Sequence, residues 1–441
     1  MPARVSPLYR RLPPGPHRLT RSEVARHQRL RIHGAMIEAV AEHGYAATSV
    51  GLVVGLAGVS RRCFYEQFAN KEQCFLATFD LIAGRGLDRV RRAYIAAGGD
   101  RDARLAAAFG QFAELAVTRR KAASLVLLEA QTAGTGGLLH VRRLSAACEA
   151  LLARSFIEPA GARPLPAPLL RAIAGGLREA MSGFVRQPAS AGRVDRADPA
   201  ESLARWTLSF QSPAAERMSD QLPERVVRRL RASATGARGS AYLRARRGDS
   251  RSRVLESALR LAALDDYGQL TAARIADAAN LSMDAFHELF AGRDECFLAA
   301  LDMLGAELLS IAAAAGPRSS GWAHAARRAI GELMCFFAEH PVYARTIARE
   351  AFGAGPRAAR RNLDLSHSVA ALLTRGAPER GPNTMLVDGL AGAIWHTVLC
   401  QVAAARIQLL PAMSDYLTYV ALAPSIGAEA AAEVIREEIS S

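Results

Sequence analysis

The run from Gly58 to Phe68 combines side chains that could read DNA with side chains that could hold a helix in a core. Four polar side chains carry guanidinium, phenol or amide groups: Arg61, Arg62, Tyr65 and Gln67. Phe64 and Phe68 are four residues apart, so they share one face of a helix and can anchor it. A short, rigid helix with such polar groups on its free face has the chemistry needed to read the DNA major groove.

The flanking residues predict a helix-turn-helix. Gly58 can take the left-handed conformation that a tight corner needs, and Ser60 is a good N-cap for the helix that follows. Thr48 and Ser49 begin a preceding helix that runs to about Ala57. Still earlier, apolar residues at helical spacing predict an amphipathic helix: Ile32, Ala35, Met36, Ala39 and Val40.

This order of landmarks resembles the amino-terminal DNA-binding domain of TetR-type transcriptional regulators. Over about residues 29–80 the family pattern stands as Gly44-Tyr45, Thr48-Ser49, Gly58-Val59-Ser60, Phe64-Tyr65, Phe68 and Lys71-Glu72. One departure is Val54, where the family usually has a small Ala inside the turn. The resemblance implies repression that is relieved when a small molecule binds a helical body, and C-terminal helices that build a four-helix dimer interface.

Residue chemistry and the resemblance together predict the DNA contacts. Arg61, Arg62 and Gln67 are expected to contact bases or phosphates. The other predicted DNA-binding residues hold the backbone or cap the helices: Arg29, Thr48, Ser49, Ser60, Tyr65 and Lys71. Lys71 lies at a helix N-terminus, where the helix dipole favours acids, so a phosphate partner explains its position better than solvation does.

Charge favours a nucleic-acid partner. The 441 residues are enough for two to four domains, and the formal net charge of +14 favours a polyanion such as double-stranded DNA. Residues 1–31 hold eight arginines and one acid, Glu23. This segment is either a solvated tail or an arm laid along phosphates or into the minor groove, and the sign and position of its charge favour the arm.

The motifs of enzymes and metal sites are missing from the sequence. The six cysteines form no CxxC pair and show no metal-ligand spacing, and no signal peptide is evident, which favours a cytoplasmic protein with reduced thiols. There is no HExxH, P-loop or GxSxG motif. The glycine-rich run Gly134–Gly137 lacks GxGxxG spacing and a preceding strand, so we expect a plain loop there. We expect neither catalysis nor a cofactor nor a membrane span.

A second segment repeats the first at a constant spacing of 222 residues. Gly58–Ala77 aligns with Asn280–Ala299 without a gap. Identical residues in the two copies include the N-cap, both core phenylalanines and a cysteine: Ser60 and Ser282, Phe64 and Phe286, Phe68 and Phe290, Cys74 and Cys296. A period this long indicates duplicated domains, and the second copy resembles the TetR-type domain over about residues 251–304.

The copies differ on the face predicted to read DNA. The four polar residues of the first copy are replaced by Met283, Asp284, His287 and Leu289. An Asp that faces phosphates is repelled, so the second copy either reads DNA weakly or serves as a scaffold or partner surface. Residues 225–253, with ten arginines and one acid, could still supply non-specific phosphate contacts.

The chain shows no strand-like alternation of useful length, which predicts an all-α fold with two tandem halves. The expected domains are a basic arm, a helix-turn-helix domain, a helical regulatory domain, an Arg-rich linker, a second, degenerate helix-turn-helix domain and a second helical regulatory or dimerisation domain: 1–28, 29–80, 81–212, 213–248, 249–304 and 305–441. Each half ends in two apolar helices, expected near Leu169–Val185 and Ala200–Phe210, and near Thr384–Ala405 and Gln408–Leu422. These helices pair either within one chain, as a pseudo-dimer, or between two chains.

Two residue groups in the second half have competing interpretations. Trp395 and His396 lie on an apolar helix and either line a ligand cavity or, as we favour, pack in the core. Arg345, Arg349 and Glu350 form a helical charge cluster, for which a solvated face is expected. The sequence predicts a sequence-specific, ligand-responsive DNA-binding regulator; the alternative is a ligand-sensing or protein-docking helical scaffold in which DNA binding is secondary.

Overall fold

The computed structural model describes residues 20–157, 164–186, 199–218, 249–314, 321–378 and 383–437. Within these ranges every regular element is a helix, so the predicted all-α fold is confirmed. Residues 1–19 of the predicted basic arm (1–28) and residues 219–248 of the predicted Arg-rich linker (213–248) lie outside the described residues.

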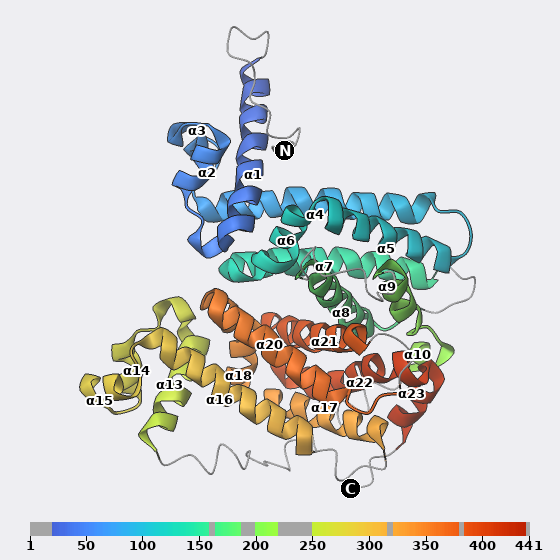
Figure 1. Ribbon diagram of the computed structural model, residues 1–441. Coiled ribbons are helices and arrows are strands. Elements are labelled where there is room, and N and C mark those ends of the chain that lie inside the picture. The colour runs from blue at the N-terminus through green and yellow to red at the C-terminus, as the bar shows by residue number, and fades with distance from the viewer. Residues whose placement is uncertain are drawn as a thin grey trace.

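The chain begins with a helix-turn-helix unit at one end of the molecule (Figure 1). Its helices are α1 (Arg21–Ala47), α2 (Val50–Ala57), α3 (Arg61–Tyr65) and the start of α4 (Lys71–Ala96). The Ser49 and Ser60 hydroxyls accept hydrogen bonds from the backbone N–H groups of Leu52 and Cys63, so they cap α2 and α3 as predicted. Phe64 and Phe68 are fully buried against α1, which confirms the predicted anchor face.

A helical body follows α4. Its elements are α5 (Arg101–Thr118), α6 (Arg120–Ser124), the π-helix η2 (Leu125–Glu129), the 3₁₀-helix η3 (Ala130–Thr132), α7 (Gly134–Ile157), α8 (Ala167–Arg186), α9 (Pro199–Leu208) and α10 (Pro213–Arg217). A π-helix is rare and often marks a functional position. Here it leads directly from α6 into the short turn before α7.

The expectation of a loop at Gly134–Gly137 is wrong, because these residues form the first turn of α7. The reason is the close approach of neighbouring elements. A Cβ at Gly137 would lie only 2.0 Å from the Ala130 carbonyl oxygen, and one at Gly136 would lie 2.5 Å from Glu72 Oε1. The glycines therefore serve tight packing between η3, α4 and α7 rather than chain flexibility.

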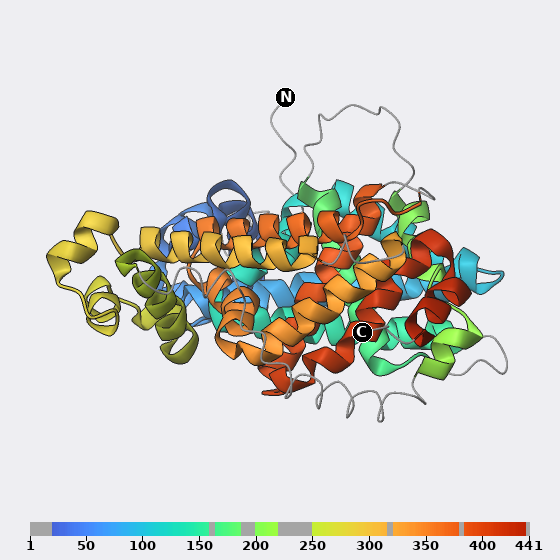
Figure 2. The ribbon, with the colours of Figure 1, turned by 90° about the horizontal axis from the view of Figure 1, so that it is seen from below.

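The second half has a similar order of elements, with the additional 3₁₀-helices η5 and η8. Its helix-turn-helix unit consists of α13 (Ser250–Asp265), the 3₁₀-helix η5 (Tyr267–Gln269), α14 (Ala272–Ala278), α15 (Met283–Leu289) and the start of α16 (Arg293–Ala314). Its body contains α17 (Trp322–Glu339), α18 (Pro341–Arg345), the π-helix η7 (Thr346–Glu350), α19 (Ala351–Gly353), α20 (Pro356–Leu373), α21 (Asn383–Ala403), η8 (Ile407–Leu409), α22 (Leu410–Ile426) and α23 (Ala428–Arg436). Figure 2 shows this half in front of the first one.

The two helix-turn-helix units share unusual backbone conformations. Gly58 (φ 59°) and Asn280 (φ 56°) are both left-handed at the corner before α3 and α15. Asparagine is one of the few non-glycine residues that tolerate this conformation, as expected from the sequence. A second positive φ occurs at Gly44 (75°), a kink near the end of α1, and at Asp266 (66°), directly after α13.

Side-chain contacts correspond as well. The Arg29 guanidinium lies 4.9 Å from the Phe68 ring centroid, and that of Arg251 lies 4.5 Å from the Phe290 ring centroid. Arg251 lies 222 positions after Arg29, and Phe290 lies 222 positions after Phe68. The second unit therefore keeps the frame of the first one, including a cation–π contact at its base.

Helices α8 and α21 form the most extensive helix–helix contact among the described residues and join the two bodies. Glycines let their backbones approach closely: a Cβ at Gly175 would lie 2.8 Å from the Gly392 carbonyl oxygen, and a Cβ at Gly392 would lie 2.4 Å from the Gly175 carbonyl oxygen. The neighbouring helices also meet, since the Tyr419 hydroxyl of α22 donates to the Phe210 carbonyl just after α9 (3.1 Å).

By length and composition alone, the segments Arg293–Ala314 and Thr384–Ala403 are apolar enough to cross a membrane. More than half of the most apolar stretch of each is buried inside the molecule. Helices in the core of a water-soluble protein have the same character, so their apolar composition is explained by burial.

Candidate nucleic-acid interface

The free face of α3 presents three exposed side chains. Arg61, Arg62 and Tyr65 are all exposed, and Tyr65 keeps 54% of its surface accessible. The Arg62 Nε lies 3.0 Å from Glu66 Oε1, an exposed pair one helical turn apart that contributes little stability and leaves the guanidinium accessible. The Tyr65 ring packs edge-on against buried Phe64 (centroids 5.4 Å apart), which directs its hydroxyl away from the core.

Gln67 lies apart from these three residues. It is half-buried after the end of α3, and its Nε2 donates to the Cys63 sulfur (3.6 Å). Cys63 in turn donates to Gln28 of α1 (3.1 Å). The amide of Gln67 thus faces the α1 side of α3.

Of the residues predicted to contact the DNA backbone or to cap the helices, some are exposed and others have a structural role. Ser49 and Ser60 are exposed caps at the N-termini of α2 and α3, the ends of helices that attract phosphate. Thr48 is only 2% exposed, and its hydroxyl donates to the Gly44 carbonyl (2.8 Å). Lys71 is half-buried, and its Nζ donates to the carbonyls of Tyr45 (3.0 Å) and Ala46 (3.3 Å).

Arg29 and Lys71 both stack on aromatic rings, on Phe68 and Tyr45 respectively. Lys71 therefore satisfies carbonyl groups at the end of α1, which explains its presence at the start of α4 without a phosphate. Burial lowers the pKa of its ammonium group. Arg29 remains exposed beside the ring.

A buried histidine stabilises the frame behind α3. His33 Nδ1 lies 2.7 Å from the Thr78 hydroxyl, and its ring packs edge-on against Phe68. Burial, together with the nearby charges of Arg29 and Arg85, lowers the pKa of His33 to about 4. The imidazole is therefore neutral near pH 7 and serves as a hydrogen-bonding core residue.

In the second unit the equivalent surface is chemically different. Met283, Asp284 and His287 are exposed on α15, and Leu289 is half-buried. The exposed positions of α15 thus present a thioether, a carboxylate and an imidazole in place of two guanidiniums and a phenol. This surface has no guanidinium and carries a negative charge that repels phosphate.

A glutamate links each body to its helix-turn-helix unit, and the sequence did not single out this role. Glu129, the last residue of the π-helix η2, accepts a hydrogen bond from the Tyr45 backbone N–H (2.9 Å). Glu350, the last residue of the π-helix η7, accepts one from the Tyr267 N–H (2.9 Å). The expectation that Glu350 lies on a solvated face is wrong: it is 3% exposed, because it fills this backbone site and pairs with Arg349.

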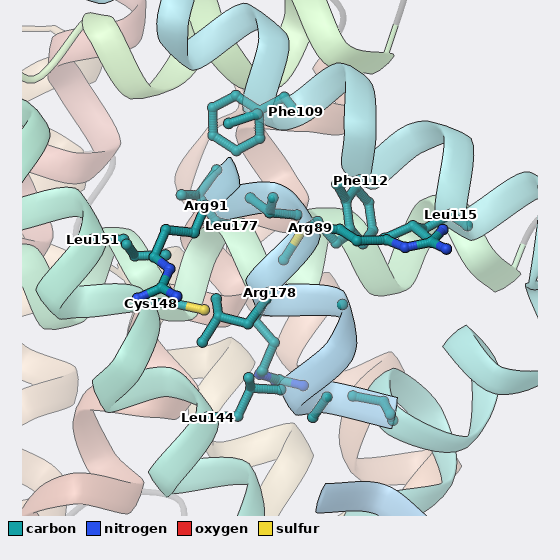
Figure 3. Close-up of a pocket in the computed structure, with 18 of the residues that line it drawn as sticks. Arg89, Arg91, Phe109, Phe112, Leu115, Leu144, Cys148, Leu151, Leu177 and Arg178 are labelled. Atoms are coloured by element: carbon teal, nitrogen blue, oxygen red, sulfur yellow. The ribbon is translucent and has the colours of Figure 1, made fainter. Parts of the chain in front are cut away.

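The first body contains a cavity of about 550 Å³ between α4, α5, α7 and α8 (Figure 3). The π-helix η2 contributes Val126 and Leu127 to its lining. The predicted candidates Trp395 and His396 are not among the lining residues; both are buried on α21, beside α8. Within the described residues, no group of three or more His, Cys, Asp or Glu side chains could hold a metal ion.

Residues 34–78 match the model of the bacterial regulatory proteins of the tetR family. The matched segment contains α2 and α3 and reaches into α1 and α4. For this segment the match agrees with the TetR-type helix-turn-helix predicted from the sequence.

Several solved structures resemble the chain weakly, and two of them are described here. One is the fatty acid degradation regulator FadR from Bacillus halodurans, with 21% identity and a TM-score of 0.35 over 41% of this chain and 94% of that one. The other is a TetR family transcription regulator from Marinobacter aquaeolei VT8, with 18% identity and a TM-score of 0.31 over 39% of this chain and 96% of that one. No curated protein sequence matches the chain.

Proposed function

We propose that this protein is a cytoplasmic, ligand-responsive transcriptional repressor that reads operator DNA with its first helix-turn-helix. The observation that carries the proposal is the free face of α3, where Arg61, Arg62 and Tyr65 are exposed around a buried phenylalanine anchor. Guanidiniums and a phenol on a short helix suit contacts to bases and phosphates in the major groove. The exposed caps Ser49 and Ser60 place two helix N-termini beside this face.

We further propose that the chain is a tandem duplicate whose halves form an intrachain pseudo-dimer, with the domain boundaries expected from the sequence. The support is the matching order of elements, the corresponding cation–π contacts and left-handed corners, and the glycine-mediated contact between α8 and α21. Both helix-turn-helix units lie toward the same end of the molecule (Figure 1). The second unit, with Asp284 in place of a guanidinium, would contribute weak DNA contacts or none.

Ligand response would pass through the π-helix η2. Val126 and Leu127 line the cavity, and Glu129 of the same π-helix holds the Tyr45 N–H beside the kink at Gly44. A molecule that moves the cavity wall would therefore act on the kink near the end of α1, just before α2 and α3. This arrangement provides the physical connection that a regulator needs between an effector site and a DNA-reading helix.

Replacing Glu129 by alanine tests this connection. The Tyr45 N–H loses its partner, so we expect the folded state to lose about 1–3 kcal/mol and the DNA affinity to fall several-fold. The matched control is Glu350→Ala, which removes the equivalent bond to Tyr267. It should lower the melting temperature but leave DNA affinity unchanged, as measured by fluorescence anisotropy. Equal losses of DNA affinity in the two variants would contradict the assignment of DNA reading to the first unit.

The function itself is tested by a nuclease footprint of the full-length protein on the DNA upstream of its own gene, followed by genome-wide binding. Two symmetric half-sites about one helical turn (~34 Å) or more apart would mean that first units from two chains read a palindrome. A single or asymmetric site is the result expected for an intrachain pseudo-dimer. Absence of specific binding across the genome would refute the proposed function.

A further inference from the structure

The cavity in the first body has an apolar wall and a strongly basic lining. Aliphatic and aromatic side chains from α4, α5 and α7 form most of the wall, among them Phe109, Phe112 and Leu144 (Figure 3). The ionisable lining consists of arginines, a tyrosine and a cysteine, with no Asp or Glu. The arginines are Arg85, Arg89, Arg91, Arg119, Arg154 and Arg178. An apolar space with basic groups and no acids attracts amphipathic anions.

Five of these arginines are exposed, and one of them, Arg91, pairs with Asp88 (3.3 Å). Arg178 is buried, with 6% of its surface accessible. Its Nη2 donates to Glu179 Oε2 (3.2 Å), but its Nε and Nη1 have no hydrogen-bond partner among the described residues. Ser145, which also lines the cavity, has a buried hydroxyl without a partner among the same residues. Buried donors without partners are costly, and each needs an explanation.

Contacts within the protein satisfy only some of the hydrogen-bond donors of the Arg178 side chain. Its guanidinium stacks on Trp395 (4.7 Å to the ring centroid) and pairs with Glu179. Glu179 is itself shared, because Arg186 donates to its other oxygen (2.7 Å). Two guanidiniums thus share one carboxylate, which the His367 Nε2 also approaches (3.6 Å) while it pairs with Asp388 (3.0 Å). Of these charged residues only Arg178 lines the cavity.

We infer that this cavity binds an apolar molecule with a single carboxylate head group, which Arg178 anchors through its Nε and Nη1 donors. A head group with one negative charge matches the one buried guanidinium that lines the cavity, and the apolar wall takes the rest of the molecule. The exposed arginines of the lining would attract the anion. The ligand of this cavity would be the effector of the regulator proposed above. Its regulatory role therefore rests on the proposed function, whereas its binding to the cavity does not.

The test is calorimetric titration of the full-length protein, without DNA, with decanoate and with its uncharged counterpart decan-1-ol. We expect decanoate to bind at least tenfold more tightly than decan-1-ol. Arg178→Met should weaken decanoate binding about tenfold to a hundredfold and leave decan-1-ol binding nearly unchanged, because only the charged head group loses its donors. Arg178→Lys, which keeps the charge, should retain more affinity and provides a second variant if the Met variant does not fold.

The matched control is Arg186→Met, which removes the other guanidinium from Glu179 without altering the cavity lining. It should keep decanoate binding within a few-fold of the wild-type protein. Equal affinity for the two probes, no decanoate binding, unchanged binding by Arg178→Met, or an equal loss in the two Met variants would each overturn the inference. If the wild-type protein binds no operator DNA in a separate assay, the proposed function is refuted, but the result on decanoate binding still stands.

Discussion

Replacing Arg62 and Tyr65 together by alanine is expected to lower operator affinity about a hundredfold, because each side chain supplies an interaction worth about 1–3 kcal/mol. Both are exposed on α3, so their removal leaves no cavity, and the ion pair that Arg62 forms with Glu66 lies at the surface. Folding should therefore be unaffected. Fluorescence anisotropy with operator DNA at physiological salt measures the effect, and circular dichroism verifies the fold.

The matched control is the double substitution Asp284→Ala and His287→Ala at the equivalent positions of α15. It should leave operator affinity within a few-fold of the wild-type value or raise it slightly, because a carboxylate is removed from a surface near phosphates. An unchanged affinity in the α3 variant, or a greater reduction in the α15 variant, would show that the reading face has been assigned to the wrong helix.

Substituting Gly392 by alanine should destabilise the whole molecule by about 1–3 kcal/mol, since overpacking forces tightly packed backbones apart. The new Cβ would lie 2.4 Å from both the Glu179 Cβ and the Gly175 carbonyl oxygen. Neither atom is the flexible end of a side chain, so α8 and α21 must separate. Differential scanning calorimetry at fixed protein concentration measures the effect.

Gly331→Ala is the control for the helix propensity of alanine. Gly331 lies within α17, and a Cβ there would meet nothing within 4 Å. Alanine should therefore stabilise this helix by up to about 1 kcal/mol, the opposite sign to the change at Gly392. A stabilised Gly392 variant would mean that the contact between α8 and α21 is looser than described.

Local signals in the sequence predicted much of the fold. The caps Ser49 and Ser60, the anchors Phe64 and Phe68, and the helical body all follow from residue type and spacing, and these expectations agree with the structure. The left-handed corner at Asn280 could also be predicted, because asparagine is one of the few non-glycine residues that adopt this conformation. Such features depend on neighbours in the chain.

The features that depend on distant residues were missed. The bond from Tyr45 to Glu129 spans 84 residues, and no periodicity in the sequence signals it. The glycines of Gly134–Gly137 resembled a loop because the neighbouring carbonyl and carboxylate that require them become visible only after folding. Arg178 likewise has no distinguishing local pattern, since its burial follows from the packing of α7, α8 and α21 around it.

The contact between α8 and α21 has a consequence for how such a regulator behaves in a cell. Both helices belong to one polypeptide, so dilution does not separate them, whereas two separate subunits dissociate when they become scarce. A repressor with this architecture would remain assembled at very low copy number. In a symmetric homodimer every substitution occurs twice, but here each half can change alone. One unit could therefore keep the exposed arginines that we propose read DNA, while the other diverged to a surface without them.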